Sequence, residues 1–220
     1  MAAAELCRPA PVERYVFALL FGAVLVDATD GFFARLWNVH RYAARIDGRT
    51  IDDLVDYLTF TFLPLMLMAR MEWLPEPVWL WIVPALIASL FGFANREAKD
   101  EAGGFFLGFP SYWNIVAFYA GLFHPTDAPA GSYLLAVAIL FLALLTVLPV
   151  RFIYPTLAPA PWRIPILAGA GVWLLQLIAL LVLYPSPPAW LTLSSLLYPA
   201  FYTAVSLYLA PPGFKSPGKG

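Results

Sequence analysis

Long apolar stretches, separated by short polar connectors, follow one another along the whole chain. They run approximately over residues 14–35, 51–71, 76–95, 105–123, 132–150, 164–184 and 189–209. A helix needs about 20 predominantly apolar residues to cross a bilayer. Each stretch is also longer and more continuous than a buried strand. The pattern therefore predicts an all-α fold, a polytopic transmembrane helix bundle with about seven spans.

Composition supports this prediction and limits the possible partners. Hydrophobic residues make up 61% of the 220 residues and charged residues 12%, whereas a soluble domain has about 25% charged residues. The 13 Lys and Arg residues nearly cancel the 14 Asp and Glu residues, which excludes a basic surface for nucleic acid. Pro-rich connectors read as turns, and no internal repeat is evident. We expect a tail over residues 1–13, one membrane domain over 14–210 and a second tail over 211–220.

The distribution of basic residues predicts the orientation of the bundle. Cytoplasmic loops of membrane proteins carry an excess of Lys and Arg. Alternating the spans places ten of the 13 basic residues on one side: Arg35, Arg41, Arg45, Arg49, Arg96, Lys99, Arg151, Arg163, Lys215 and Lys219. This side is predicted to be the cytoplasm, with the C-terminus inside and the N-terminus outside.

Several carboxylates interrupt the apolar pattern near the start of the chain. Asp27 and Asp30 lie within the first stretch, and Asp52, Asp53 and Asp56 begin the second. A carboxylate at mid-membrane depth costs about 3 kcal/mol, so such residues are usually functional. Helical spacing places Asp27 and Asp30 on one face and Asp52 and Asp56 on another, whereas Asp53 points elsewhere.

Asp53 has a structural explanation of its own. Thr50 and Asp53 have the spacing of a capping box, with Thr50 as the N-cap residue and Asp53 at the third helical position. A turn at Gly48 would bring the two helices together as an antiparallel pair. We therefore expect the remaining four carboxylates, from Asp27, Asp30, Asp52 and Asp56, to converge near the cytoplasmic face.

Four carboxylates without a soft ligand suit a hard divalent cation, Mg²⁺ or Mn²⁺. Such a set can hold two ions about 3.5–4 Å apart, an arrangement used for in-line displacement at phosphorus. Gly31 and Ala34 leave their helix face without bulk, and Arg35 and Arg49 are placed to pair with phosphate oxygens. The alternative is an ion-paired helix hairpin without chemistry.

These residues resemble a known signature. The pattern Asp27-x2-Asp30-Gly31-x2-Ala34-Arg35-x12-Gly48-x3-Asp52-x3-Asp56 is similar to that of the CDP-alcohol phosphatidyltransferase family. The gap of twelve residues is longer than the eight common in that family and resembles its phosphatidylcholine synthase branch. Further stretches resemble the same branch: Asp56–Thr59, Gly108–Asn114 and Leu145–Phe152.

The resemblance implies an integral enzyme of the bacterial inner membrane with an active-site cavity that faces the cytoplasm. It implies transfer of a phosphatidyl group from CDP-diacylglycerol to choline, with release of CMP. Asp27, Asp30 and Asp52 would be metal ligands, and Asp56 would complete the metal site and act as the general base. Gly31, Ala34 and Gly48 would accommodate the cytidine, and Arg35 would contact phosphate. Members of the branch resemble eight-span proteins, whereas only about thirteen residues precede the first span here.

The acceptor pocket is less constrained by the sequence. Choline carries a permanent positive charge that suits aromatic faces, and the candidates are Tyr57, Tyr112, Trp113 and Tyr119, with Asn114 as a polar neighbour. The alternative for each of these residues is packing within the bundle. Serine, inositol phosphate and glycerol phosphate stay open as acceptors, a homodimer stays open as the assembly, and an ion or proton transporter is the alternative from another class.

Overall fold

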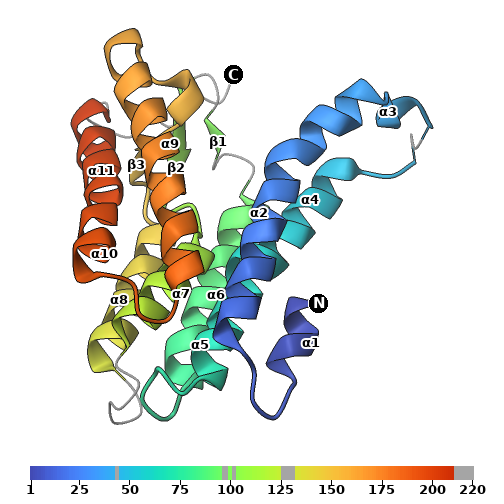
Figure 1. The fold of residues 1–220 in the computed structure, drawn as a ribbon. Coiled ribbons are helices and arrows are strands. Elements are labelled where there is room, and N and C mark those ends of the chain that lie inside the picture. The colour runs from blue at the N-terminus through green and yellow to red at the C-terminus, as the bar shows by residue number, and fades with distance from the viewer. Residues whose placement is uncertain (43–44, 96–98, 101–102, 125–131, 211–220) are drawn as a thin grey trace.

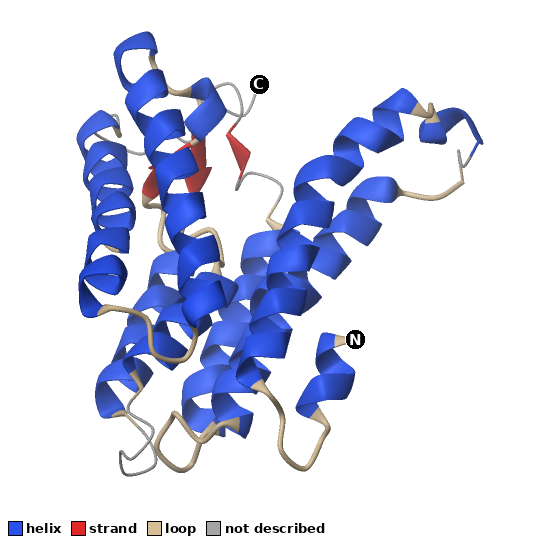
Figure 2. Ribbon diagram, viewed as in Figure 1, coloured by secondary structure: helices blue, strands red, loops and turns tan. Residues whose placement is uncertain are grey.

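The fold was obtained as a computed structural model, which describes residues 1–42, 45–95, 99–100, 103–124 and 132–210. The described chain is mostly helical, with a small sheet at one end (Figures 1 and 2). The helical elements are α1 (Ala2–Leu6), α2 (Glu13–Leu36), α3 (Val39–Tyr42), α4 (Gly48–Asp56), the π-helical η1 (Tyr57–Phe62), α5 (Leu63–Arg70), α6 (Trp79–Ala94), α7 (Trp113–Phe123), α8 (Tyr133–Val147), the 3₁₀ turn η2 (Pro155–Leu157), α9 (Ala160–Leu183), α10 (Ala189–Ser195) and α11 (Leu197–Leu209).

Two helices are long and apolar enough to cross a membrane, judged by length and composition. These are α2 and α9, each of 24 residues, while α6, α7 and α8 are shorter apolar helices. The stretch predicted over 51–71 is helical throughout but passes from α4 through η1 into α5. The stretch predicted over 189–209 is divided at Leu196 into α10 and α11. Helices thus occupy most of the predicted stretches, and seven crossings stay a prediction.

A three-stranded sheet departs from the expected all-α fold. Strands β1 (Lys99–Asp100), β2 (Phe105–Leu107) and β3 (Arg151–Ile153) pair antiparallel in the order β1-β2-β3. The register places Phe105 opposite Ile153 and Leu107 opposite Arg151. The stretch predicted as a helix over 105–123 therefore begins as a strand, and its helix α7 starts only at Trp113. Apolar periodicity could not separate these two states over so few residues.

The segment predicted as an N-terminal tail is partly ordered against the bundle. Ala2 and Leu6 of α1 are buried in the main core, which contains residues of α2 and α5. The Arg70 guanidinium at the end of α5 donates hydrogen bonds to the backbone carbonyls of Arg8 and Pro9. The predicted C-terminal tail over 211–220 lies outside the described residues.

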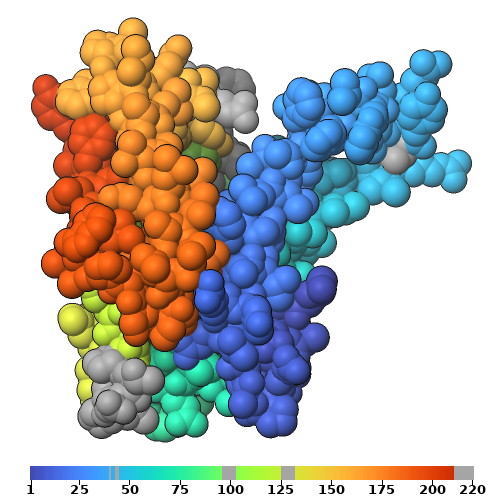
Figure 3. All heavy atoms as spheres, in the orientation of Figure 1, coloured from blue at the N-terminus to red at the C-terminus, as the bar shows by residue number. Residues whose placement is uncertain are grey.

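The helix pair that carries the acidic motif extends beyond the rest of the molecule. Figure 3 shows the end of α2, together with α3 and α4, projecting from the body. Deeper in the molecule, α2 contacts η1 and α7. The C-terminal helices α9, α10 and α11 lie side by side, and α9 also contacts α2 (Figure 1). The acidic motif therefore sits where the projecting pair enters the bundle.

Candidate functional site

Three of the predicted metal-ligating carboxylates converge in the structure. Each of Asp27, Asp52 and Asp56 offers an oxygen atom, and these atoms lie within 4.8 Å of one another. All three side chains are half-buried, and they line a cavity of about 370 Å³ between α2 and α4. Asp30 lines the same cavity from an exposed position but does not belong to the group of three. The antiparallel pairing expected from the turn at Gly48 thus brings the two acidic faces together.

The donor set of this acidic cavity suits a hard divalent cation. Three carboxylates from two helices provide only oxygen ligands, which Mg²⁺ and Mn²⁺ prefer. The only cysteine of the chain, Cys7, is exposed in the segment before α2. The geometry of the three oxygens is therefore compatible with the binding of a divalent cation.

The start of α4 differs from the predicted capping box. Asp47, and not Thr50, is the N-cap residue, and its carboxylate accepts hydrogen bonds from the backbone N–H of Arg49 and Thr50. The Thr50 hydroxyl also donates to Asp47, at 2.8 Å. These bonds, above all those from Thr50, hold the pKa of the Asp47 carboxyl below its usual range. The prediction of Thr50 as N-cap was therefore wrong, because the helix begins at Gly48.

Asp53 takes no part in the group of three carboxylates, in agreement with its predicted separate face. Its carboxylate lies 3.9 Å from the Arg49 guanidinium, one helical turn earlier. Arg49, which was predicted to pair with phosphate, therefore has a partner on its own helix. Asp52 and Asp53 are adjacent residues of the same type in different surroundings, which makes them a matched pair for experiments.

The small residues of the motif leave space at the cavity and beside it. Gly48 lines the acidic cavity, and a Cβ atom built on it would meet nothing within 4 Å. A Cβ atom on Gly31 would lie 3.4 Å from the Arg35 guanidinium, so Arg35 folds back over Gly31. Ala34 is exposed on the same helix. The space that the motif was predicted to leave for a ligand is thus present at Gly48 and is bordered by an arginine at Gly31.

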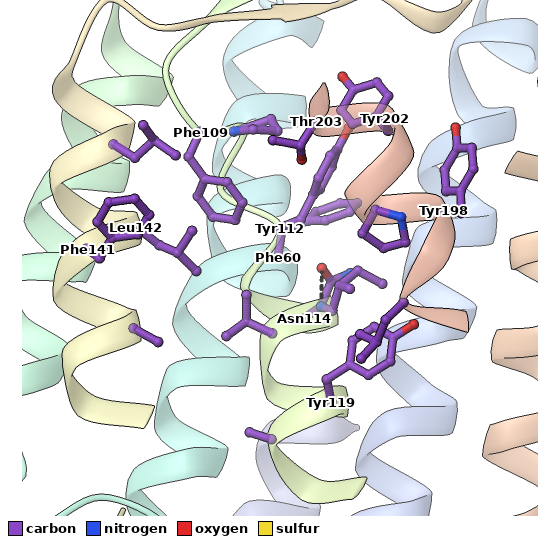
Figure 4. A pocket seen from close by; sticks show the side chains of 18 of the residues that line it. Phe60, Phe109, Tyr112, Asn114, Tyr119, Phe141, Leu142, Tyr198, Tyr202 and Thr203 are labelled. Atoms are coloured by element: carbon purple, nitrogen blue, oxygen red, sulfur yellow. Dashed lines mark hydrogen bonds between the residues drawn. The ribbon is translucent and has the colours of Figure 1, made fainter. Parts of the chain in front are cut away.

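A second and much larger cavity lies next to the acidic one. It has a volume of about 1160 Å³ and is lined mainly by apolar and aromatic side chains of α7, α8 and α11 (Figure 4). Val24 and Phe60 line this apolar cavity, whereas Ala23 and Thr59, their chain neighbours, line the acidic cavity. The two cavities therefore border each other along α2 and η1.

Adjacent residues of η1 face different cavities at a π-helical turn. The turn begins at Tyr57, directly after Asp56, and a π-helical turn changes the register of the residues that follow it. Such turns occur frequently at functional sites. Thr61, within η1, is fully buried, and its hydroxyl has no hydrogen-bond partner among the described residues. The π-helical turn η1 thus lies where the two cavities border each other.

The predicted acceptor residues separate into two groups. Tyr112, Asn114 and Tyr119 line the apolar cavity. Trp113 is fully buried, and its indole N–H donates to the Ser89 hydroxyl at 2.7 Å. The Tyr57 hydroxyl donates to the backbone carbonyl of Leu86 at 3.2 Å. Trp113 and Tyr57 thus contact other parts of the bundle and line neither cavity.

The sequence analysis did not identify the contribution of the C-terminal helix to the apolar cavity. Tyr198, Tyr202 and Thr203 of α11 line it opposite residues of α7 (Figure 4). Tyr112 lies within electrostatic range of Asp27 and Asp56 in the acidic cavity. No local sequence signal connects positions about ninety residues apart, and only the packing of α11 reveals this proximity.

Curated phosphatidylcholine synthases resemble this chain. The protein of Legionella bozemanae is 34% identical over 148 residues, which cover 66% of this chain and 65% of that protein. The protein of Legionella pneumophila is 38% identical over 146 residues, or 64% of this chain and 55% of that protein. The protein of Rhizobium meliloti is 28% identical over 197 residues, or 87% of this chain and 74% of that protein. No protein-family model and no solved structure matches the chain.

These similarities confirm the resemblance predicted from the acidic motif. Several independent relatives carry the same name, and their identities range from 28% to 38% in the three comparisons above. The chain spans less than two thirds of the length of the two Legionella proteins, 65% and 55%.

Proposed function

We propose that this chain is a membrane phospholipid synthase that transfers a phosphatidyl group from CDP-diacylglycerol to choline and releases CMP. The observation that carries the proposal is the arrangement of the two cavities. A group of three carboxylates and a large apolar cavity lie next to each other, and both cavities border α2 and η1. A substrate with a charged pyrophosphate and two acyl chains needs a polar and an apolar cavity next to each other.

Two divalent cations, Mn²⁺ or Mg²⁺, would hold the pyrophosphate in the acidic cavity. Asp27, Asp52 and Asp56 provide converging oxygen atoms, and we include Asp30 as the fourth ligand because it lines the same cavity. Bound cations would offset the negative charge that develops on the departing CMP phosphate.

Asp56 is the residue we assign as the general base. Asp56 lies at the end of α4 and lines the acidic cavity. It directly precedes η1, whose residues border both cavities. As the acceptor oxygen forms its bond to phosphorus, the hydroxyl proton passes to a carboxylate oxygen of Asp56. The bond between the phosphorus and the CMP oxygen breaks in the same displacement, and CMP leaves with the electron pair of that bond.

The remaining motif residues would orient the nucleotide end of the substrate. Gly48 opens the cavity, and Gly31 and Ala34 keep the neighbouring face of α2 free of bulk. The exposed Arg35 guanidinium, which borders Gly31, would pair with a phosphate oxygen. We place the diacylglycerol part in the portion of the apolar cavity that is lined by α8, whose leucine and phenylalanine side chains are compatible with acyl chains.

The proposal includes a membrane location. Residues 14–210 would form one transmembrane catalytic domain in a bacterial inner membrane, with the acidic cavity facing the cytoplasm. The two long apolar helices and the apolar surfaces of α6 and α8 support an integral protein. A homodimer would be compatible with this arrangement.

A reconstituted assay tests the proposal. Purified protein in liposomes is incubated with Mn²⁺, CDP-diacylglycerol and labelled choline, and in parallel with labelled serine, inositol phosphate or glycerol phosphate. We expect phosphatidylcholine and an equal amount of CMP, and Asp56→Asn should lower turnover by at least about 10²-fold. Equal use of serine would overturn the assignment of choline. An ion flux that survives Asp56→Asn, without lipid synthesis in the wild type, would indicate a transporter.

A further inference from the structure

Tyr112 lines the apolar cavity within electrostatic range of the acidic one. It is the residue before α7 and lines the apolar cavity, and 43% of its surface is accessible. Its neighbours Ser111 and Trp113 are 4% and 0% accessible, so the exposure of Tyr112 is toward the cavity. Tyr112 also lies within electrostatic range of Asp27 and Asp56. The tyrosine is therefore open to a ligand in the apolar cavity and close to the acidic one.

A strained residue and a buried hydrogen-bond network fix the position of Tyr112. Ser111 has a φ angle of 55°, in the left-handed region that non-glycine residues rarely adopt. Its hydroxyl donates to the Ser89 hydroxyl at 3.1 Å, and the Trp113 indole donates to the same oxygen at 2.7 Å. Such strain persists only where the surroundings enforce it, and it gathers at functional sites. The network thus holds the two neighbours of Tyr112 in place and presents its ring to the cavity.

Tyr202 of α11 forms the opposite wall of this part of the cavity. Its hydroxyl donates to the backbone carbonyl of Ile153 at 2.7 Å, and its ring stacks on Phe152 with 6.4 Å between ring centroids. Tyr202 lies within electrostatic range of Tyr112, and Figure 4 shows both residues at the same end of the cavity. Since its proton is already engaged with Ile153 and its oxygen contacts the Ser206 hydroxyl, Tyr202 offers its ring and no free donor.

The charge distribution around these two rings favours a cation without N–H donors. The described residues that line the apolar cavity include no Asp, Glu, Lys or Arg. A primary ammonium has three N–H donors that all need acceptors, whereas a quaternary ammonium has none and binds to aromatic faces.

We infer that Tyr112 and Tyr202 together form the binding site for the quaternary ammonium group of the acceptor alcohol. The inference rests on the proposed function, because it orients the acceptor with its hydroxyl toward Asp56. It assigns specificity to a pair of rings from distant parts of the chain. It also predicts that the enzyme selects the acceptor by its permanent charge and its methyl groups.

Paired substitutions at Tyr112 test this assignment. Tyr112→Phe keeps the aromatic face and removes the hydroxyl group. Tyr112→Leu removes both, and its side chain is as apolar as that of phenylalanine. We expect Tyr112→Leu to raise the KM for choline about 5- to 30-fold, as the loss of a cation–π contact would. The KM for CDP-diacylglycerol should change less than about 2-fold, and Tyr112→Phe should stay within about 3-fold of the wild type for choline. Tyr202→Leu should repeat the effect of Tyr112→Leu.

A neutral analogue separates cation recognition from a structural role. In 3,3-dimethylbutan-1-ol a carbon atom replaces the nitrogen of choline, so its shape is retained without the charge. The wild type should prefer choline to this alcohol in kcat/KM, and Tyr112→Leu should reduce that preference by the same factor by which it raises the KM for choline. Tyr208→Leu is the matched control, since Tyr208 lies on α11 with 76% of its surface exposed.

The outcomes distinguish failure of the inference from failure of the proposed function. If the wild type makes phosphatidylcholine but Tyr112→Leu and Tyr112→Phe have equal KM values for choline, the ring site is wrong and the function stands. Equilibrium binding of labelled choline to the purified protein serves as a second readout. Binding that depends on the Tyr112 ring, in a protein without transferase activity, would support the site and overturn the function. Binding that is unchanged in Tyr112→Leu would overturn the site.

Discussion

Replacing one carboxylate of the acidic cavity should abolish turnover and yet stabilise the metal-free protein. Oxygen atoms of Asp27, Asp52 and Asp56 lie within 4.8 Å of one another, and at that separation two unit charges repel by about 3.5 kcal/mol in an effective dielectric of about 20. Water at the half-buried cavity and hydrogen bonds to the carboxylates reduce this repulsion, so we take about 1 kcal/mol per pair. Asp52→Asn removes two such pairs, or about 2 kcal/mol.

This free energy is large enough to measure by thermal unfolding. A stabilisation of about 2 kcal/mol corresponds to a rise of about 4–8 °C in Tm for a chain of this length. The wild type and Asp52→Asn are compared in detergent, first with EDTA and then with Mn²⁺. With EDTA, Asp52→Asn should have the higher Tm. Mn²⁺ should raise the Tm of the wild type, because it binds the folded state, and should have little effect on Asp52→Asn.

Asp53→Asn is the matched control for this experiment. Asp53 is adjacent to Asp52 but stands outside the group of three and faces Arg49 at 3.9 Å. Its substitution should leave the response to Mn²⁺ intact and change stability by less than about 1 kcal/mol, as expected for an exposed ion pair. If Asp52→Asn and Asp53→Asn respond alike to EDTA and to Mn²⁺, the three carboxylates do not form a common cation site.

Two further predictions concern the elements that hold the site. Gly108→Ala should destabilise the protein by more than about 2 kcal/mol in thermal unfolding, because Gly108 has a φ angle of 82° and its new Cβ atom would lie 2.2 Å from the Thr146 carbonyl oxygen. Gly171→Ala in α9 is the control, because a Cβ atom there would have no neighbour within 4 Å, and it should be neutral or stabilising by up to about 1 kcal/mol. Equal changes in stability for Gly108→Ala and Gly171→Ala would contradict the close contact between Gly108 and Thr146. Because the pKa of Asp47 is lowered in the folded state, its cap fully stabilises α4 at pH values above the pKa of the unfolded state. This stabilisation is lost as the pH falls through the pKa of the folded state. The Tm difference between wild type and Asp47→Ala should therefore be constant from neutral pH to about pH 5 and should shrink below about pH 4, and a difference that grows in acid would refute the cap.

The acidic site was largely predictable from the sequence because carboxylates in an apolar stretch are costly. Asp27 and Asp56 would not persist there without a function that needs their charge, so their helical spacing carries information. The start of α4 was less predictable. Asp47 and Thr50 are both good N-cap residues, and the chain around Thr50 also matched a capping pattern. Only the observed bonds to Asp47 decide between the two.

The acceptor side of the site could not be predicted in the same way. Aromatic side chains are inexpensive in an apolar protein, so Tyr57 and Tyr112 carried equal weight in the sequence although only Tyr112 lines the apolar cavity. The α-helical register did not help either. It places Thr59 and Phe60 on one face with Asp56, whereas in the structure Thr59 lines the acidic cavity with Asp56 and Phe60 lines the apolar cavity.

Long-range backbone contacts explain why two separate stretches of the resemblance belong to one structural unit. The Gly108 N–H donates to the Val150 carbonyl at 2.7 Å, and the Phe109 N–H donates to the Leu145 carbonyl at 3.0 Å. A side chain at position 108 would collide with this second segment, so the close approach requires glycine. The same contact sets the path of the chain into the strained Ser111 and hence the position of Tyr112. A motif that reads as a short local pattern therefore acts through packing about forty residues away, where it helps to position the tyrosine that we assign to acceptor recognition.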